Sequence, residues 1–138
     1  LNDMKARNSL ILIVFLLGFA GCVFEPIDVS LEGSWQCEET SEIYMKAMKG
    51  TSIFPVYIAQ DAMSDSKYYV DNFYNMGSGS DISFTIIGRS ISISKQSVSG
   101  IEFEGSAILS SDNNTIEFTY TADDGGGVVD HVTATYTR

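Results

Sequence analysis

Few side chains in this sequence could perform chemistry, and the single histidine limits the choice most. His131 stands in the run Asp130-His131-Val132, so a Ser–His–Asp site would have to use it. The alternating pattern around His131 points its side chain outward, and serine is so abundant that one nearby would carry no information. We therefore expect a protein that is not an enzyme.

The sequence supports a metal site or acid–base catalysis as little as it supports a Ser–His–Asp site. Two cysteines and one histidine are too few for a zinc site. Asp123 and Asp124 stand beside three glycines but lack the spaced ligands of a calcium loop, so a solvated hairpin loop is preferred. Glu102 and Glu104 share one strand face, as a glycosidase pair would, but their neighbours indicate an exposed, solubilising face. We expect no metal and no cofactor.

Aromatic residues are the best candidates for binding. Tyr57, Tyr68, Tyr69, Phe73 and Tyr74 gather in two neighbouring segments, the second and third expected strands. They could line the mouth of a barrel, or dock a sugar or a protein. They could equally be ordinary core and girdle residues, and the sequence leaves both interpretations open.

Residues 1–21 have the pattern of an export signal. Lys5 and Arg7 form a positive start, and residues 10–17 (LILIVFLL) are an apolar run too short for a comfortable transmembrane helix. Small residues follow at Gly18, Ala20 and Gly21.

The signal ends in Phe19-Ala20-Gly21-Cys22, which resembles the bacterial lipobox. The resemblance implies cleavage after Gly21 and a diacylglyceryl group on the sulfur of Cys22, whose acyl chains (such as palmitate) anchor the protein in a membrane. Val23 is not the Asp of an inner-membrane retention signal, which favours the outer membrane. Residues 22–30 would be the lipidated cysteine and a tether. The alternative is an ordinary secretory signal followed by a coincidental cysteine.

Composition limits the remaining possibilities. The 138 residues leave room for one domain, here residues 31–138. A net charge of −10 repels phosphate backbones, so we expect no nucleic-acid partner and a membrane contact made through the lipid anchor. Once Cys22 is acylated, Cys37 has no disulfide partner, and a buried, inert thiol is its preferred interpretation over a nucleophile.

From residue 31 onward, apolar and polar residues alternate with period two between turn residues, which is typical of strands. Pro55 indicates a bulge or an edge. One helical turn is expected at residues 42–49. Because every connection is short, the pattern predicts an all-β, antiparallel, eight-stranded up-and-down meander that closes into a barrel. The expected strands are residues 31–39, 52–60, 67–73, 81–87, 90–95, 100–109, 115–122 and 128–137.

The alternation also predicts which face of each strand is buried. The expected interior consists of Ile82, Phe84, Ile86, Ile91, Ile93, Ile101, Phe103, Leu109, Ile116, Phe118, Tyr120, Val132, Ala134 and Tyr136. The expected wet face carries Glu102, Glu104, Glu117, Thr119, Thr133 and Thr135.

Three features together resemble the calycin superfamily, and more closely the lipocalin-like lipoproteins of Bacteroidota. They are Gly33-Ser34-Trp35, similar to the lipocalin G-x-W motif, the stretch from Asp71-Asn72-Phe73 to Ile93, and the closing segments 116–120 and 130–136. The resemblance implies a lipocalin-like barrel in which Trp35 plugs the closed end. The chain is short for a ligand-carrying lipocalin.

Two functions follow as expectations. The first is a non-enzymatic binding lipoprotein of the cell envelope that takes a small apolar ligand, a glycan or a protein. The second is a solid-core structural or inhibitor-type protein that acts through exposed loops such as residues 77–80 and 123–127. Whether the barrel is hollow or packed decides between the two, and the sequence leaves that open.

Overall fold

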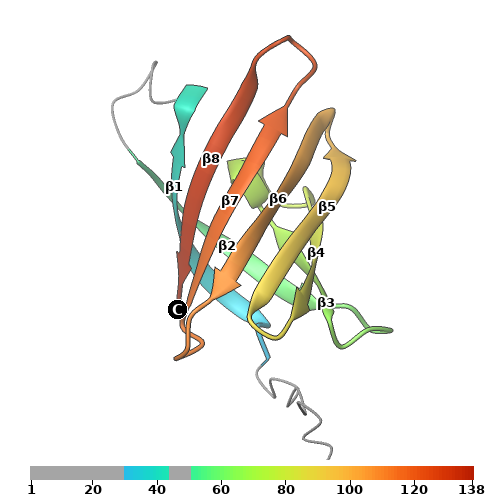
Figure 1. Ribbon diagram of the computed structural model, residues 1–138, viewed down its shortest axis with the longest axis vertical. Helices are drawn as coiled ribbons and strands as arrows, with labels where there is room; N and C mark the ends of the chain where they lie inside the picture. Colours follow the sequence, from blue (N-terminus) through green and yellow to red (C-terminus); the bar gives the residue numbers. More distant parts are fainter. Residues whose placement is uncertain (1–29, 44–50) are drawn as a thin grey trace, which may run out of the picture.

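The computed structural model describes residues 30–43 and 51–138. They form a closed barrel of eight antiparallel strands in up-and-down order, as the sequence predicts (Figure 1). Each strand pairs with the next, and β8 pairs back with β1, so the sheet has no free edge. The strands are β1 (Gly33–Ser41), β2 (Ser52–Gln60), β3 (Lys67–Asp71), β4 (Ile82–Ile87), β5 (Ser90–Val98), β6 (Ile101–Leu109), β7 (Thr115–Asp123) and β8 (Val129–Thr137).

Some strand boundaries differ from the prediction for local reasons. The third strand stops at Asp71 because Asn72 adopts the left-handed conformation (φ 62°), which cannot continue a strand. The chain then forms a short 3-10 helix, η1 (Phe73–Asn75), in place of the predicted end of the strand. The fifth strand runs on to Val98 across a register shift between Ile93 and Gln96.

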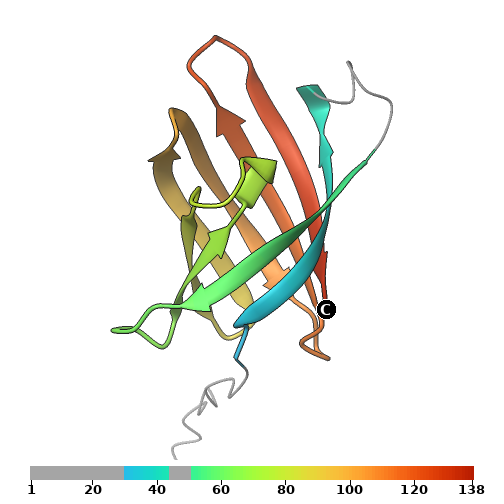
Figure 2. The ribbon, with the colours of Figure 1, turned by 180° about the vertical axis from the view of Figure 1, so that it is seen from behind.

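The barrel has two distinct ends (Figures 1 and 2). The N-terminal end holds Ser30, where the described chain begins, the connections at 61–66, 88–89 and 110–114, and Arg138. Hydrogen bonds from Arg138 to the carbonyls of Ser30 and Asn113, both 3.1 Å, draw these segments together. The far end holds residues 41–43, η1 and the connections at 99–100 and 124–128.

Aromatic rings fill the interior that the described strands enclose. Phe73 and Tyr120 lie 4.6 Å apart between ring centroids, as do Phe118 and Tyr136, and Phe73 meets Phe103 edge-on at 5.3 Å. Such offset and edge-on pairs stabilise beyond the area they bury. The predicted interior residues are buried, except that Ile86 and Ile101 are only partly so and pack against the core.

Pro55 lies in β2 without the bulge considered from the sequence. The pairing of β1 with β2 runs without a shift through Gln36↔Pro55. On its other side β2 pairs with β3 only from Tyr57 to Gln60, so Pro55 lies beyond that ladder, where a missing N–H costs nothing. The Asn72 side-chain amide instead donates to the Pro55 carbonyl at 2.7 Å.

Gly105 marks a close approach between β6 and β7. A Cβ atom at this position would lie 2.4 Å from the Thr119 carbonyl oxygen and 2.6 Å from the Tyr120 Cα. Only glycine lets the two strands come this close, next to the Tyr120 ring in the core.

Several expectations fall outside the described residues. They include the expected signal segment with Gly21, the expected lipidation site Cys22 with most of the expected tether, and residues 44–49 of the expected helical turn. Within the described ranges, no helix is long and apolar enough to cross a membrane.

Candidate functional site

The five aromatic residues that the sequence offers as candidates for binding do not form one cluster. Tyr68 and Phe73 point into the core and are buried. Tyr74 lies at the far end, where its hydroxyl reaches Asp130. Tyr57, 46% exposed, and the half-buried Tyr69 lie on the outer face of β2 and β3. The structure therefore divides the predicted site between core residues and an outer surface.

Tyr57 and Tyr69 line a groove on the outside of the barrel, which we call the tyrosine groove. Its volume is about 330 Å³. The strand register builds it, because Tyr57 pairs with Asp71 and Ala59 pairs with Tyr69 across β2 and β3. The groove is lined by Tyr57, Ala59, Tyr69, Asp71, Ser78, Gly79 and Asp81.

Two carboxyl groups line the tyrosine groove, and their pKa values are shifted in opposite directions. Asp71 accepts hydrogen bonds from the Gly79 N–H at 2.8 Å and the Ser78 hydroxyl at 3.2 Å, and the Gly79 bond does most to lower the Asp71 pKa. Partial burial raises the pKa of Asp81, and the neighbouring Asp71 raises it further. Asp71 is thus a fixed acceptor, while Asp81 takes up a proton more readily.

Local contacts hold the ring of Tyr69 in place. Its hydroxyl donates to Asp61 Oδ2 at 2.8 Å, and the Lys67 ammonium lies 5.2 Å from the ring centroid. The opposite rim, residues 77–79, is fixed by Asn72, whose side-chain oxygen accepts from the Gly77 N–H at 2.8 Å. The groove is therefore largely preformed, as a binding site for a small ligand needs to be.

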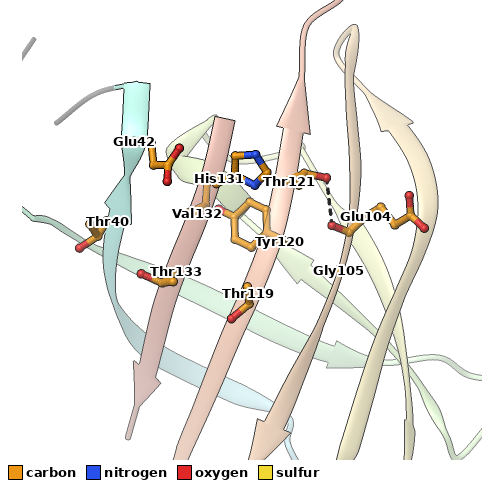
Figure 3. Close-up of a pocket in the computed structure, with 10 residues that line it drawn as sticks. All are labelled: Thr40, Glu42, Glu104, Gly105, Thr119, Tyr120, Thr121, His131, Val132 and Thr133. Carbon is orange, nitrogen blue, oxygen red and sulfur yellow. Dashed lines mark hydrogen bonds between the residues drawn. The ribbon is translucent and has the colours of Figure 1, made fainter. Parts of the chain in front are cut away.

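A second hollow, of about 440 Å³, lies on the outer face of β6, β7, β8 and β1 (Figure 3). Four threonines are among the residues that line it, and Thr121 Oγ1 donates to the Glu104 carbonyl oxygen at 3.4 Å. His131 lines it and is exposed, as the alternation predicts. Asp130, its chain neighbour, points to the opposite face of β8 and is buried, so these two side chains do not form a catalytic pair.

Two carboxyl groups are buried inside the barrel towards the far end. Asp130 accepts from the Ser41 hydroxyl at 2.5 Å, the Tyr74 hydroxyl at 2.6 Å and the Ile43 N–H at 3.1 Å. Glu39 accepts from the Tyr120 hydroxyl at 2.6 Å. These bonds compensate the cost of taking the carboxyl groups out of water.

Burial also changes the acidity of interior groups. It raises the pKa of Glu39 to about 7, with Asp130 adding to the rise and the Tyr120 bond opposing it. Burial raises the pKa values of Tyr120 and Tyr136 well above their usual range as well. The Tyr136 hydroxyl is fully buried and has no hydrogen-bond partner among the described residues.

Trp35 lies in the core at the N-terminal end of the barrel. Its indole N–H donates to the Leu31 carbonyl at 2.9 Å, and the Arg138 guanidinium lies 4.4 Å from its ring centroid. Leu31 is itself buried, so the chain closes over the ring before β1 starts.

The remaining candidates for chemistry, Cys37, Asp123 and Asp124, are either buried or hydrogen-bonded within their own turn. Cys37 is completely buried, as the sequence predicts, and burial raises its thiol pKa well above the usual range. Asp123 and Asp124 accept from the N–H groups of Gly125 and Gly126, both at 2.8 Å, so each is engaged in its own turn. Within the described ranges, no group of three His, Cys, Asp or Glu side chains could hold a metal ion.

Sequence reasoning missed the polar half of the tyrosine groove and both interior acids. The signal for the interior acids was present. Strict alternation places Glu39 on the same face as Trp35 and Cys37, and Asp130 on the same face as Val132. Asp71, Ser78 and Asp81 gave no such signal, because they meet only through the turn that follows η1.

Comparisons with known proteins add no assignment to this geometry. No protein-family model matches the chain, and a search of curated proteins finds no match.

Proposed function

We propose that this chain is a lipid-anchored lipoprotein of the cell envelope that binds a neutral glycan, without enzymatic activity, in the tyrosine groove. The single observation that carries the glycan assignment is the preformed outer groove, which combines Tyr57 and Tyr69 with Asp71, Ser78 and Asp81. The anchor is argued from the lipobox-like run that ends at Cys22.

The arrangement suits a sugar because it offers both surfaces that a sugar has. The C–H face of a pyranose ring packs on a flat aromatic ring, and Tyr57 presents an exposed one. Sugar hydroxyl groups donate hydrogen bonds to carboxylates and exchange them with serine hydroxyls. The fixed Asp71 carboxylate, held by Gly79 and Ser78, provides an acceptor that needs little reorganisation on binding.

The interior argues against the small apolar ligand that the sequence also allowed. Phe73 and Tyr120 lie 4.6 Å apart between ring centroids. Phe84 of β4 lies 6.2 Å from Phe118 of β7, so rings from strands that are not neighbours meet where a carried ligand would have to lie. The tyrosine groove and the hollow over β6, β7, β8 and β1 both lie on the outer wall. The packed interior also agrees with the second expectation, a solid-core interaction protein that acts through exposed loops. Residues 78 and 79 belong to such a loop and also line the tyrosine groove.

The negative charge of the protein restricts which class of glycan we expect it to bind. The chain carries a net charge of −10, and two acidic residues line the groove itself. A sulfated or uronic-acid polymer would be repelled, while a neutral sugar would not. The lipocalin-like ancestry suggested by Gly33-Ser34-Trp35 is part of the same proposal.

The test is a binding assay with the acylated protein, purified in detergent from cells that express the full chain. The probes are neutral oligosaccharides of glucose, mannose, galactose and N-acetylglucosamine. We expect at least one to bind, and Tyr57→Ala to weaken it roughly tenfold, the equivalent of about 1.4 kcal/mol of stacking. Thr119→Ala, in the other hollow, is the matched control and should leave affinity unchanged. Binding that survives Tyr57→Ala, or no binding to any probe, would overturn the glycan assignment.

A further inference from the structure

The N-terminal end of the barrel exposes apolar side chains. Met63, at the tip of the β2–β3 connection, is 94% exposed, and its N–H is held by Asp61 Oδ1 at 2.8 Å. Ile87 and Ile108 are 74% and 65% exposed and flank Ser90 in the sheet register, so they are neighbours on the outer wall close to the same end. The far end also exposes apolar side chains, among them Ile53 at 62% and Val128 at 64%, so charge and tether length must decide which end meets a membrane.

Three cations lie at this same end. Arg89 donates to the carbonyls of Ser110 and Ser111 and to the side chain of Asn113, and Arg138 donates to the carbonyls of Ser30 and Asn113. Because these acceptors are neutral, they orient the guanidinium groups without cancelling their charge. Together with Lys67, they partly offset the five local carboxylates, which are Glu32, Asp61, Asp65, Asp112 and Glu117.

The far half of the barrel is strongly acidic by comparison. The cation of the described residues that lies there, Lys95, is already paired with Glu102 at 2.9 Å. The carboxyl groups in this half are Glu38, Glu39, Glu42, Asp71, Asp81, Glu102, Glu104, Asp123, Asp124 and Asp130. An anionic surface would repel this half much more strongly than the N-terminal end.

Chain length restricts which end can approach the membrane. From Cys22 to Ser30 there are eight residue steps, which span at most about 29 Å when fully extended. The nine-residue strand β1 rises roughly 30 Å along its own direction, so the far end could face the anchor only with the tether stretched nearly to its limit. A relaxed tether keeps the N-terminal end against the bilayer.

We propose that the N-terminal end docks on the bilayer that holds the anchor. Met63 enters the headgroup region, and Arg89 and Arg138 lie close to the lipid phosphates. The acidic far end then points away from the membrane. This inference rests on the proposed acylation of Cys22, and the surface is separate from the tyrosine groove on the wall of β2 and β3.

The experiment uses the acylated full-chain product in vesicles of phosphatidylethanolamine and phosphatidylglycerol, with a polarity-sensitive fluorophore on one introduced cysteine. Met63→Cys reports the N-terminal end, and Val128→Cys, at a site 64% exposed, is the matched far-end control. Labelling is selective because Cys22 is blocked by its lipid and Cys37 is completely buried. Both replaced side chains are exposed, so neither variant should unfold.

We expect the label at position 63 to shift its emission to the blue on reconstitution and to be quenched by headgroup-nitroxide lipids. The label at position 128 should do neither. Equal exposure of the two labels to water, or quenching at position 128 alone, would overturn the docking. Mass spectrometry of the same samples separates the two proposals. A missing acyl mass refutes the anchor and the docking together, while acylated protein with a water-exposed label at 63 refutes only the docking.

Discussion

The Tyr74 hydroxyl donates a 2.6 Å hydrogen bond to the buried carboxylate oxygen Asp130 Oδ2, which joins η1 to β8 across the far end of the barrel. Ser41 and Ile43 donate to the same carboxyl group from β1 and the residues just after it. Asp130 therefore connects three parts of the chain that are distant in sequence. Its 1% exposure means that water cannot replace a donor that is lost.

Tyr74→Phe should destabilise the barrel by about 1–2 kcal/mol, because it leaves one acceptor of a buried carboxyl group short of a donor. Tyr57→Phe removes the same hydroxyl from an exposed ring and should change stability by less than about 0.5 kcal/mol. Urea unfolding followed by circular dichroism measures both. Equal effects of the two substitutions would mean that the bond to Asp130 does not hold η1 in place.

Glu39 should make the barrel less stable as pH rises towards 7. Its pKa in the folded protein is about 7, against an ordinary value of 4.5, so the folded state holds a proton that the unfolded state has already released. This contribution to stability is fully present below pH 4.5 and is lost as pH rises through 7. At about 1.36 kcal/mol per pKa unit, its upper limit is about 3 kcal/mol.

Glu39→Gln isolates that contribution, because glutamine keeps an acceptor for Tyr120 and cannot titrate. The stability of wild type minus that of Glu39→Gln should fall between pH 4.5 and 7 and then level off. Thermal unfolding at half-unit pH steps gives this difference. A difference that stays flat over the range would show that Glu39 is not buried in its protonated form.

Gly105→Ala should destabilise the barrel strongly. The new methyl group would lie within 2.6 Å of the β7 backbone, and overpacking of this kind costs about 1–3 kcal/mol or more. Ser106→Ala is the matched control, since residue 106 is exposed and should cost less than about 0.5 kcal/mol. Denaturant unfolding of both variants provides the test, and a harmless Gly105→Ala would contradict the close approach of β6 and β7.

Cys22→Ser should release the protein from the membrane fraction, since no sulfur remains to carry the diacylglyceryl group. Cys37→Ser keeps Cys22 and should leave the protein in the membrane fraction. Fractionation of cells that express each variant gives the answer. If the Cys22→Ser protein stays with the membrane after a carbonate wash, the lipid anchor is not what attaches it.

The barrel could be predicted because the residues within each strand are enough to identify its buried face. Alternation through Ile116, Phe118 and Tyr120, or Val132, Ala134 and Tyr136, names the buried face of each strand without reference to any other strand. Eight such strands with short connections leave few topologies other than a closed meander. The third strand was extended too far because nothing in Asp71-Asn72-Phe73 announces that Asn72 will adopt a left-handed conformation.

The tyrosine groove could be predicted only in part because it depends on register. Tyr57 and Tyr69 were recognised by type, but Tyr68 and Phe73 are chemically similar and lie in the core. Separating them required knowing that Tyr57 is placed opposite Asp71, and that the turn after η1 brings Ser78 alongside. Alternation along β8 assigns Asp130 to the interior and His131 to the outer face, but the residue types alone do not indicate that a carboxyl group will be buried.

The most direct test of the account is to follow the tyrosine ring resonances of the acylated protein by NMR while a neutral oligosaccharide that binds it is added. We predict that the rings of Tyr57 and Tyr69 shift in proportion to occupancy, while those of the buried Tyr120 and Tyr136 do not move. Shifts confined to Tyr120 and Tyr136 would place the ligand inside the barrel and contradict the tyrosine groove as the binding site.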